Sequence, residues 1–511
     1  MAAGLFQRGQ LAEAREIAAL AAGNPFAEDR IAREQALLAE AWVESAGASP
    51  EQWAVPQPNP NVQALAEKAE ALLSDARLRY LKLRARLPRQ TASIYQDLVF
   101  FVLFNRVSPE LEKLIERCEQ APVETLRVNG YTSFLKDAAH FLPDGLLDAY
   151  RDVGYERLYA VFFQIRRAYQ YIATGFAGSS PAARQVRARI WQSVFTRDMH
   201  RYQRALAMRM GDIITLITGP SGSGKEQVAQ ALGWSRYIPF DAKRQCFEAN
   251  FRGLFFPINL SALSPTLIES ELFGHRKGAF TGALQDREGY LETCGPFGTV
   301  FLDEIGEVEA SIQVKLLRVL QTRSFARIGD TVSRPFEGKL MAATNRDLEA
   351  EMQAGGFRQD FYFRLCADRI ETPSLRAIID QTPGELERIV SYIAHNFAGP
   401  EEAGSLTGEV MGTIQTQLGA DYPWPGNFRE LEQCIRNVLV HGEYQPVLLQ
   451  GKDGSDSTSG IFKGLLQNGL PPAEAILRRY VRHVVSQSET YEKASSILEM
   501  DRRTIKRHLQ D

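Results

Sequence analysis

The sequence predicts an α/β protein in which a parallel sheet flanked by helices lies between helical regions. Residues 1–177 carry alanine and leucine at helical spacing, with charged residues on the opposite faces. From residue 178 onward, short apolar runs alternate with helical stretches, which is typical of parallel strands joined by helices. After Pro373 the pattern becomes helical again. We therefore predict an all-α N-terminal domain, an α/β core over residues 178–372 and a helical region over residues 373–446.

The composition is that of an ordinary globular protein. The 511 residues include 44% hydrophobic and 24% charged residues, and the net charge of −3 excludes a wholly basic nucleic-acid coat but not a local basic patch. The most apolar run, residues 98–104, is far shorter than the ~20 residues that span a bilayer, and the first ten residues lack the core of a secretory signal. The five cysteines are scattered and form no CxxC pair, which indicates reduced thiols. We expect a cytoplasmic protein without a membrane partner.

The N-terminal region predicts helices but no familiar sensor domain. Residues 11–22, 31–44 and 62–87 are helical segments, and the proline-rich residues 56–61 separate the first two from the third. Stacked helical hairpins and a plain bundle both remain open, because no repeat period is convincing. We predict a helical sensory or partner-binding domain.

Four apolar runs predict the strands of the core. They cover residues 212–219, 254–260, 299–304 and 339–345. Each run ends in small or polar residues, as buried parallel strands do when their carboxyl ends line a site.

The stretch GPSGSGKE follows the first strand and opens a predicted helix. In this context, glycines let backbone N–H groups surround phosphates, the helix N-terminus adds positive potential, and the lysine reaches the outer phosphates. A glycine-rich turn without a ligand is the alternative. The glutamate stands where the general motif has a serine or threonine that holds Mg²⁺. The predicted phosphate-binding residues are Gly219, Pro220, Ser221, Gly222, Ser223, Gly224, Lys225 and Glu226.

Two adjacent acids strengthen the prediction of a nucleotide site. Asp303 and Glu304 end the third strand, where uncompensated burial of two carboxylates would be costly. A Mg²⁺–phosphate site explains both, with Asp303 holding the metal and Glu304 orienting the attacking water. Asn345 ends the fourth strand, where its amide is placed to sense the γ-phosphate. Together these residues predict the hydrolysis of ATP with Mg²⁺.

Residues 178–441 resemble the AAA+ domain of sigma-54-dependent transcriptional activators, the bacterial enhancer-binding proteins. The hexapeptide GAFTGA is the hallmark of that family, and the family commonly has GKE in its phosphate loop. The blocks FLDEIGE, VKLLRVLQ, AATNRDL, FRQDFYFRL and YPWPGNFREL follow in the family's order. The resemblance implies a P-loop AAA+ fold with a helical lid over residues 373–446.

The resemblance also implies roles for four residues outside the phosphate loop. Asn259 matches the asparagine that pairs with the catalytic glutamate and links nucleotide state to loop position. Arg358 and Arg364 match the arginines presented to the γ-phosphate of the neighbouring subunit, and Arg429 matches the sensor arginine of the lid. A surface salt bridge is the alternative for each arginine. Because an arginine supplied in trans raises the rate by roughly 10³–10⁵, activity would require self-assembly, from dimers to a hexameric ring.

The GAFTGA stretch predicts a tight loop with an aromatic ring at its tip, because glycine stands on both sides of Phe280. An ordinary hairpin with an exposed ring is the alternative. The resemblance implies that this loop contacts the sigma-54 RNA polymerase holoenzyme, rises when ATP is bound, and remodels the closed promoter complex. The residues concerned are Gly278, Ala279, Phe280, Thr281, Gly282 and Ala283.

Three stretches depart from the family pattern. Arg276 stands where the family usually has an acid, so packing of the loop is expected to differ. Residues 234–256 are longer than usual between the first helix and the second strand. Residues 373–386 lack the charged cluster that typically follows this position.

The carboxyl end predicts a polar linker, residues 447–470, and a small helical DNA-binding domain, residues 471–511. Ala494 and Leu498 are expected to pack one helix, and Asp501 to cap the next. This segment resembles the Fis-type helix-turn-helix, whose last helix enters the major groove of double-stranded DNA and whose dimer reads a palindrome. A solvated basic helix is the alternative. The predicted DNA-binding residues are Arg502, Arg503, Thr504, Lys506 and Arg507.

The whole pattern favours an ATP-dependent activator that binds upstream DNA and remodels the sigma-54 holoenzyme. One alternative is a DNA-binding regulator that keeps the ATPase fold without remodelling, although relatives of that kind typically lose the GAFTGA loop. A metabolic P-loop kinase is disfavoured by the arginine pair and the basic tail. The N-terminal domain is then expected to govern assembly of the ring.

Overall fold

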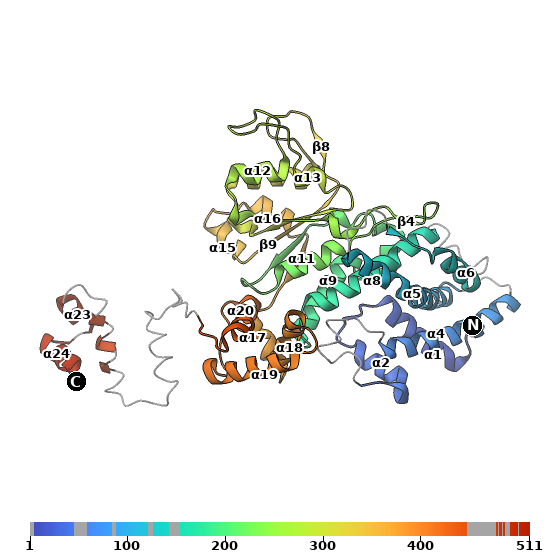
Figure 1. Ribbon diagram of the computed structural model, residues 1–511, viewed down its shortest axis with the longest axis horizontal. Helices are drawn as coiled ribbons and strands as arrows, with labels where there is room; N and C mark the ends of the chain where they lie inside the picture. Colours follow the sequence, from blue (N-terminus) through green and yellow to red (C-terminus); the bar gives the residue numbers. More distant parts are fainter. Residues whose placement is uncertain are drawn as a thin grey trace. The chain divides into compact units, whose positions relative to one another are not determined.

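The structure is a computed structural model of the chain, and its parts are labelled in Figure 1. It describes residues 5–44, 59–83, 88–120, 126–142, 154–446, 477–478, 480–482, 484–485, 491–498 and 500–510. The chain divides into two compact units, Met1–Tyr444 and Gln445–Asp511, and each is described by itself.

The first unit begins with a series of helices of very different length. They are α1 (Arg8–Ala22), α2 (Arg30–Leu38), η1 (Ala39–Ala41), α4 (Pro60–Leu83), α5 (Arg89–Gln120), α6 (Tyr131–Phe141), α8 (Tyr155–Gly175), α9 (Pro181–Phe195) and α10 (Met199–Arg201). The apolar run of residues 98–104 lies within α5 and is buried for most of its length, as predicted. The region predicted to be all-α also contributes one short strand, β1 (Leu126–Arg127).

A five-stranded parallel sheet forms the centre of the first unit. Its strands, in spatial order, are β10 (Asp368–Glu371), β2 (Thr215–Thr218), β9 (Lys339–Thr344), β6 (Thr299–Asp303) and β5 (Phe255–Asn259). Four of these lie inside the predicted apolar runs, and the edge strand β10 is the addition. Because all five run in one direction, their carboxyl ends meet at a single edge of the sheet.

Helices cover both faces of this sheet, since alternate residues of each strand point to opposite sides. In β6, Val300 and Leu302 pack in one cluster with residues of α12 (Pro265–Phe273), α14 (Ala310–Thr322) and α16 (Gln359–Leu365). Phe301 belongs to the other cluster, which holds residues of α8, α9 and α11 (Lys225–Trp234). The N-terminal helices α8 and α9 therefore share a core with the sheet, and Figure 1 shows them beside α11.

The long segment between α11 and β5 forms a hairpin that meets the N-terminal region. Its strands are β3 (Phe240–Asp241) and β4 (Cys246–Phe247), and β4 pairs in antiparallel fashion with β1. The ring of Phe247 stacks on Phe163 of α8, with 4.1 Å between the centroids. The extra length noted in the sequence thus docks the N-terminal helices onto the core.

Further helices and strands of the first unit complete the core and add a helical lid. They are α13 (Tyr290–Thr293), β7 (Ser324–Phe325), β8 (Arg334–Pro335), α15 (Leu348–Gln353), α17 (Leu375–Ile379), α18 (Glu385–Ala398), α19 (Ala403–Thr413) and α20 (Asn427–His441). The second unit contains α23 (Tyr491–Leu498) and α24 (Arg502–Gln510). The linker predicted over residues 447–470 lies outside the described residues.

Two further predictions can be compared with the described ranges. All five cysteines are free thiols, and four of them are buried. None of the described helices combines the length and the apolar character that crossing a membrane requires.

Candidate functional site

The phosphate loop lies between the end of β2 and the start of α11. Gly222 and Gly224 have φ of 72° and 94°, left-handed values that favour glycine. Lys225 folds back over the loop, and its Nζ donates to the carbonyl oxygens of Gly219 and Pro220, each at 3.0 Å. Burial lowers the pKa of Lys225, while Glu304 and Asp303 oppose that shift. The loop therefore presents a partly desolvated cation to any phosphate that enters.

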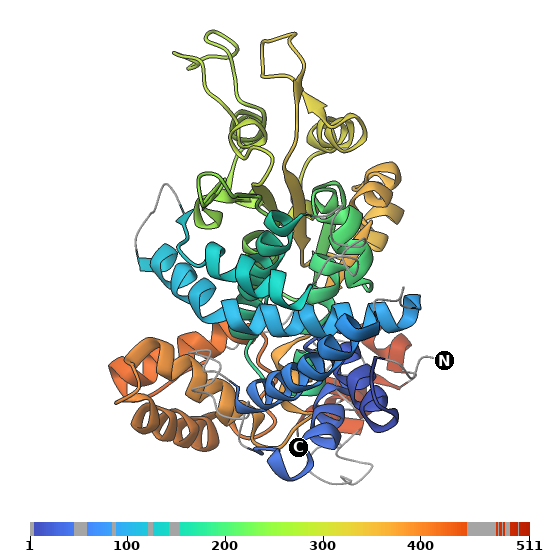
Figure 2. The same ribbon diagram turned by 90° about the vertical axis from the view of Figure 1, so that its right-hand side faces the viewer.

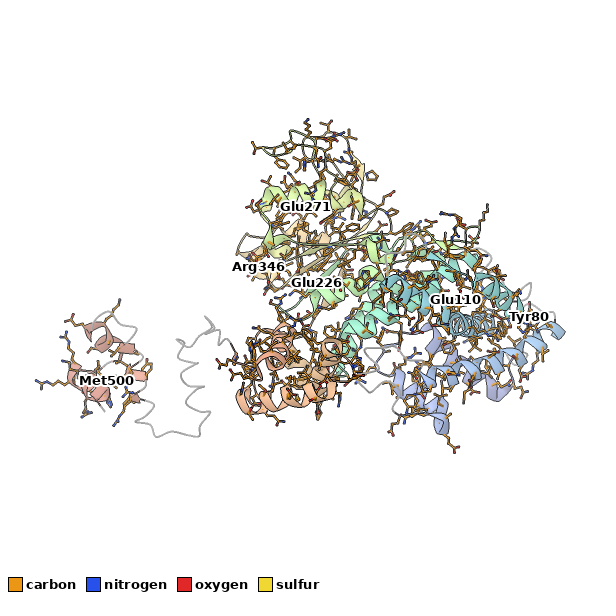
Figure 3. All side chains as sticks on the ribbon, viewed as in Figure 1. Tyr80, Glu110, Glu226, Glu271, Arg346 and Met500 are labelled. Atoms are coloured by element: carbon orange, nitrogen blue, oxygen red, sulfur yellow. The ribbon has the colours of Figure 1, made fainter. Side chains whose placement is uncertain are left out.

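Two predicted loop residues have distinct surroundings. The Ser223 hydroxyl is buried and donates to the Pro220 carbonyl at 2.7 Å, so it braces the loop from inside. Glu226 is exposed at the start of α11, where Figure 3 labels it.

The two acids stand at the end of β6. Asp303 Oδ1 accepts a hydrogen bond from the Glu304 backbone N–H at 3.0 Å, and burial raises the pKa of Asp303 above its usual value. Glu304 has φ of 57°, a left-handed conformation that is uncommon for a residue with a side chain. Its Oε2 accepts from the backbone N–H of Asn345 at 3.3 Å, which joins the ends of β6 and β9. Such backbone strain often occurs at functional sites.

The lid touches the phosphate loop directly through the start of α20. Asn427 Nδ2 donates to the Ser221 carbonyl at 2.9 Å, and the Phe428 N–H donates to the Gly222 carbonyl at 3.0 Å. A Cβ added to Gly222 would lie only 2.3 Å from the carbonyl oxygen of Gly426, so this close approach requires glycine. Arg429 Nη1 donates to Ser221 Oγ at 3.4 Å. The predicted sensor arginine is thus held against the phosphate loop.

A cavity of about 520 Å³ connects these parts. On one side it is lined by the phosphate loop, Asp303, Glu304 and Arg429, and its volume is typical of a cofactor site. On the other side lie Phe176 at the end of α8 and lid residues that include three aromatic rings and several polar side chains: Tyr392, Ile393, Asn396, Phe397, Phe428, Glu432 and Arg436. The Tyr392 hydroxyl donates to the Thr174 carbonyl at 2.6 Å and so ties the lid to α8. A phosphate-binding end and an end with several aromatic rings together suit a phosphorylated compound with a planar base.

Sequence reasoning did not identify Phe176, Tyr392 or Asn427. Phe176 follows a helix that was assigned to a separate domain, and Tyr392 lies on a helix face that reads as ordinary core. A signal for Asn427 did exist, because asparagine just before a helical run tolerates the left-handed conformation that it adopts here, with φ of 53°.

The acidic residues of this cavity fit a Mg²⁺ ion held jointly with a phosphate. Asp303, Glu304 and Glu226 all line it and offer the hard oxygen ligands that Mg²⁺ prefers. In the described part of the chain, no group of three or more histidine, cysteine or acidic residues is arranged to bind a metal by itself. A site with one or two protein carboxylates completed by phosphate oxygens and water is the usual arrangement for Mg²⁺.

Asn259 lies beside the acids but has other partners. It is aligned with Asp303 in the pairing of β5 and β6. Its Oδ1 accepts from the backbone N–H of Ser261 at 3.0 Å and from the Ser261 hydroxyl at 2.8 Å. The side chain thus caps a short turn after β5 in this structure, and the pairing with the catalytic glutamate stays a prediction.

The two arginines expected to act in trans lie away from the cavity of their own chain. Arg358 precedes α16 and forms an ion pair with Asp360, with 2.8 Å between Nη2 and Oδ2. Arg364 lies on α16 and is exposed. Phe363 beside it is 65% exposed, so this surface offers both an apolar and a cationic contact.

The GAFTGA residues form a tight loop between α12 and α13. The Gly278 N–H donates to the Ala283 carbonyl at 2.9 Å, which closes the loop at its base, and Gly278 and Gly282 have positive φ. Thr281 is exposed. The ring of Phe280 is half-buried edge-on against His275, with 4.9 Å between the ring centroids, so it lies against the loop base instead of extending free from the tip.

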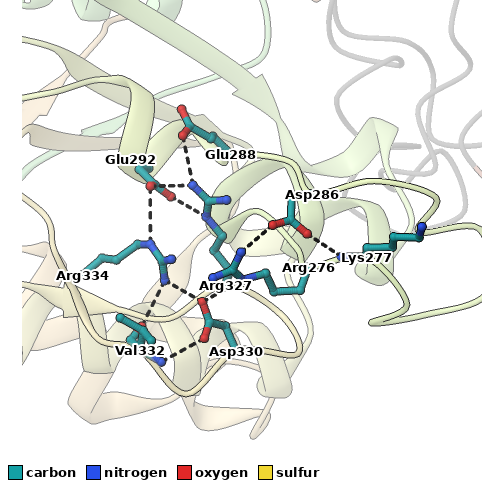
Figure 4. Close-up of polar contacts among 9 residues, drawn as sticks. All are labelled: Arg276, Lys277, Asp286, Glu288, Glu292, Arg327, Asp330, Val332 and Arg334. Carbon is teal, nitrogen blue, oxygen red and sulfur yellow. Dashed lines mark hydrogen bonds and ion pairs between the residues drawn. The ribbon is translucent and has the colours of Figure 1, made fainter.

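A second loop, residues 326–333, supports the first. The Arg276 N–H donates to the Ile328 carbonyl at 3.0 Å, and Figure 2 shows the two loops projecting together from one end of the unit. Side chains add a network of ion pairs, drawn in Figure 4. Arg276 contacts Asp286 of its own loop and Asp330 of the second loop, at 2.5 and 3.2 Å. The departure from the family pattern at Arg276 therefore has a structural role.

Further members of this network connect it to α13. Arg327 pairs with Glu292 at 2.6 Å and with Glu288 at 3.0 Å, and Arg334 pairs with Asp330 at 3.0 Å. The pKa of Asp330 is lowered to about 2, mainly by a hydrogen bond from the Val332 N–H and further by Arg334 and Arg276. Both loops are thereby fixed to α13.

The predicted DNA-binding residues lie on α24 of the second unit. Asp501 caps this helix as predicted, since its Oδ1 accepts from the N–H groups of Arg503 and Thr504 at 2.8 and 3.0 Å. Ala494 and Leu498 are buried together with Ile505, which also confirms the predicted packing. The four basic residues of α24 that were predicted to bind DNA are exposed: Arg502, Arg503, Lys506 and Arg507. Arg502 forms an ion pair with Glu492 of α23.

Comparison with known proteins places the core in a family. Residues 193–371 match the family described as the sigma-54 interaction domain. The transcriptional regulatory protein ZraR of Salmonella typhimurium is 39% identical over 275 residues, which cover 53% of this chain and 54% of that protein. The hydrogenase regulatory protein HoxA of Bradyrhizobium diazoefficiens is 40% identical over 48% of this chain and 47% of its own length. The Nif-specific regulatory protein of Azotobacter vinelandii is 40% identical over 51% and 44%.

Among solved structures, NtrX from Brucella abortus in complex with ATP matches 69% of this chain and 75% of its own, with 22% identity and a TM-score of 0.39. The chain spans about half the length of the curated relatives it matches. The matched region contains the phosphate loop, both acids, the GAFTGA loop and the arginine pair. Residues 193–371 therefore correspond to a sigma-54 interaction domain, and over this region the chain is similar to sigma-54-dependent transcriptional activators.

Proposed function

We propose that this protein hydrolyses ATP to ADP and phosphate and uses that reaction to remodel the sigma-54 RNA polymerase holoenzyme. One observation carries the proposal: a cavity built from the phosphate loop, two acids and the lid lies in the same domain as an intact GAFTGA loop. A nucleotide site without that loop would fit many ATPases, whereas the combination fits this activity.

The residues of the cavity divide the chemistry among them. Lys225 and the N–H groups of the phosphate loop bind the phosphates, and Glu304 orients and polarises the attacking water. Asp303 holds Mg²⁺, which would neutralise charge on the phosphate oxygens. Asn345 senses the γ-phosphate from the end of β9. Glu304 accepts a hydrogen bond from the backbone of Asn345 at 3.3 Å, which supports a joint response of these two residues to the nucleotide.

Assembly into a ring, from dimers to a hexamer, completes the site in this proposal. Arg358 and Arg364 are the arginines for the γ-phosphate of the neighbouring subunit. Both are exposed and neither lines the cavity of its own chain, which supports a role in trans. A head-to-tail contact of this kind closes into a ring when the rotation between subunits permits.

The GAFTGA loop is the proposed contact with sigma-54. Thr281 is exposed at the turn, and Leu284, the residue after the hexapeptide, is 83% exposed, which is unusual for a large apolar side chain. Asn259 is proposed to transmit the state of the nucleotide toward this loop. Double-stranded DNA upstream of the promoter is the proposed ligand of α24, so that the protein acts in the cytoplasm where DNA and polymerase meet.

The decisive experiment measures promoter opening by the sigma-54 holoenzyme together with ATP hydrolysis. Thr281→Ala should abolish open-complex formation and leave hydrolysis largely intact, because the residue does not line the nucleotide cavity. Thr322→Ala, an exposed threonine at the end of α14, serves as the matched control and should retain both activities. Full promoter opening by Thr281→Ala would disprove the assignment of the loop and favour a regulator that does not remodel sigma-54.

A further inference from the structure

The N-terminal helices enclose a second cavity, of about 560 Å³. Its walls come from α1, α2, α4, α5, α8 and α9, which Figure 1 shows together in the N-terminal part of the first unit. This volume lies within the range of sites that hold small organic molecules. It is separate from the nucleotide cavity, since the two have no lining residue in common.

Aromatic side chains supply much of the cavity surface: Phe100, Phe101, Phe104, Tyr169 and Trp191. Other rings hold them in place from behind. Phe162 packs against Phe100 and Phe104, with centroid distances of 4.7 and 5.7 Å. Phe26 stacks on Tyr169 at 5.6 Å and contacts Trp191 edge-on at 6.1 Å. Since these walls are fixed before a ligand arrives, a flat apolar ring could bind at a low entropic cost.

The charged residues of the lining are two arginines and one glutamate. They are Arg30, Arg166 and Glu112. Both arginine side chains are largely buried, with 13% and 9% of their surface exposed. Arg166 pairs with Glu112, whereas Arg30 pairs with Glu34, which does not line the cavity. A guanidinium in an apolar cavity binds a carboxylate strongly, because both its charge and its fork of N–H donors match that group.

Helix α8 connects this cavity to the nucleotide site. Tyr169 lines the N-terminal cavity and Thr174 lines the nucleotide cavity, five residues further along the same helix. At a rise of about 1.5 Å per residue, the two positions are only about 7.5 Å apart along the helix axis. Arg187 of α9 also donates to the carbonyl oxygen of Phe176 at 2.8 Å. Helix α9, which carries Trp191 of the cavity wall, is therefore bonded to the end of α8 as well.

The same helix is bonded to the far end of α11, the helix that follows the phosphate loop. Gln164 Nε2 donates to the Ser235 carbonyl at 2.8 Å. The buried Arg167 donates to the carbonyls of Trp234 and Arg236, each at 2.7 Å. A shift of α8 would therefore act on both ends of α11, the helix that follows the phosphate loop.

We propose that the N-terminal cavity binds an aromatic carboxylic acid and that its occupancy changes nucleotide affinity through α8. The ring packs between the walls of α5, α8 and α9, and the carboxylate is held by Arg30 and Arg166. Binding of the acid stands independently of the proposed function, whereas its coupling to the nucleotide rests on the proposed nucleotide site.

The first test titrates the full-length protein by calorimetry with benzoate, 1-naphthoate, indole-3-acetate and biphenyl-4-carboxylate, each beside its neutral amide. At least one acid should bind with one molecule per chain and about tenfold more tightly than its amide. Quenching of Trp191 fluorescence, which should disappear in Trp191→Phe, locates the ligand. Failure of every acid to bind at millimolar concentration would overturn the proposal, and equal affinity for acid and amide would overturn the role of the arginines.

Two pairs of variants sharpen this test. Ala66→Trp places a large side chain into the cavity and should weaken binding about tenfold or more, whereas Ala71→Trp, exposed on the same helix α4, should not. Arg30→Gln should reduce the preference for the acid over the amide, and Arg33→Gln, one turn away on α2, should leave it unchanged. The second pair keeps the proposal testable if Ala66→Trp does not fold. Unchanged affinity in both cavity variants would place the ligand elsewhere.

The coupling is measured with ADP, which binds without being hydrolysed. A saturating acid should change the dissociation constant of ADP about threefold or more, and ADP should change that of the acid by the same factor, because coupling is reciprocal. An acid that binds without altering ADP affinity would overturn the coupling alone. A chain that binds the acid but no nucleotide would instead refute the proposed function and leave the cavity assignment intact.

Discussion

Arg276 and Asp330 form an ion pair that joins the GAFTGA loop to the second loop, with 3.2 Å between Nε and Oδ2. Arg276 also contacts Asp286 on the opposite side, so one guanidinium holds both loops (Figure 4). Such a bridge sets the resting position of the loop with respect to the helices below it. The Arg276 side chain is 44% exposed, so the strength of the bridge depends on salt.

Reversing the charge at Arg276 should therefore impair the loop without harming the nucleotide site. Arg276→Glu would set three carboxylates side by side, and their repulsion should displace the loop. We expect open-complex formation to fall several-fold while ATP hydrolysis stays within about twofold. Arg276→Lys keeps the charge and should retain most of the opening activity. Equal promoter opening by Arg276→Glu and the unaltered protein would show that the bridge does not position the loop.

Asn427 should be needed to hold the lid on the phosphate loop. Its Oδ1 accepts from the Leu375 N–H at 2.8 Å, in addition to the bond that its Nδ2 donates to Ser221. Asn427→Ala leaves a buried N–H group and a carbonyl group without partners, at a cost of about 1–3 kcal/mol each. We expect a lower unfolding temperature and ATP binding that is weaker by about tenfold or more. Val440→Ala, on the exposed face of the same helix, should change neither, and weakened binding there would point to a general effect of the helix.

Four of the five core strands could be predicted from the sequence, and the physical reason for this also explains why β10 was not predicted. The strands β2, β6 and β9 are buried on both faces and so appear as continuous apolar runs, and the edge strand β5 carries a similar run although it is only partly buried. The edge strand β10 reads DRIE, in which only Ile370 is fully buried, so no such run marks it. Strand β1 has two residues and exists only because β4 lies beside it. Strands that form only through pairing with a distant segment are therefore hard to predict from local sequence.

The same distinction separates the site residues that were predicted from those that were missed. The phosphate loop and the two acids belong to contiguous motifs, so their chemistry can be inferred from neighbours in the sequence. Phe176 and Tyr392 reach the cavity only after α8 and the lid have packed against the core. Phe280 was predicted at a free tip because glycines flank it, but its ring lowers its exposed apolar area by packing on His275.

The ion pair between His200 and Asp97 should make the stability of the N-terminal helices depend on pH. Their Nε2 and Oδ1 atoms lie 3.1 Å apart, and the hydrogen bond to Asp97 raises the pKa of His200 above 6.5. A raised pKa means that the stabilisation is complete below the unfolded value of 6.5 and is lost as the pH rises through the folded value. Asp198 supports this shift and Arg204 opposes it, while the pKa of Asp97, raised by burial, affects stability only at more acidic pH.

We expect the unfolding temperature to fall as the pH is raised from below 6.5 to the alkaline side, with a contribution of at most about 1 kcal/mol because His200 is 39% exposed. Thermal unfolding followed by circular dichroism measures this. His200→Asn should remove the slope, and His140→Asn, an exposed histidine of α6, should retain it. A slope that persists in His200→Asn would assign it to other groups.

The last prediction concerns the proposed subunit boundary. Arg364→Ala and Glu304→Gln should each lower the turnover number by about 10³–10⁵, since one removes a transition-state contact and the other the group that orients water. Arg364→Ala keeps an intact cavity, whereas Glu304→Gln keeps an intact Arg364. If the arginine acts in trans, mixing the two inactive proteins should restore hydrolysis at boundaries where an intact cavity meets an intact arginine. If the arginine acts within its own chain, no mixture can restore it.

The control for this mixing experiment combines Lys225→Ala with Glu304→Gln, which damage the same cavity and should stay inactive at every ratio. Hydrolysis by the unaltered protein should also rise more steeply than in proportion to its concentration, since dilution removes the neighbour. Arg358→Ala should behave as Arg364→Ala does, unless its ion pair with Asp360 persists in the assembled ring and confines it to its own subunit. Restored activity with Arg364→Ala but not with Arg358→Ala would then identify Arg364 as the residue that crosses the boundary.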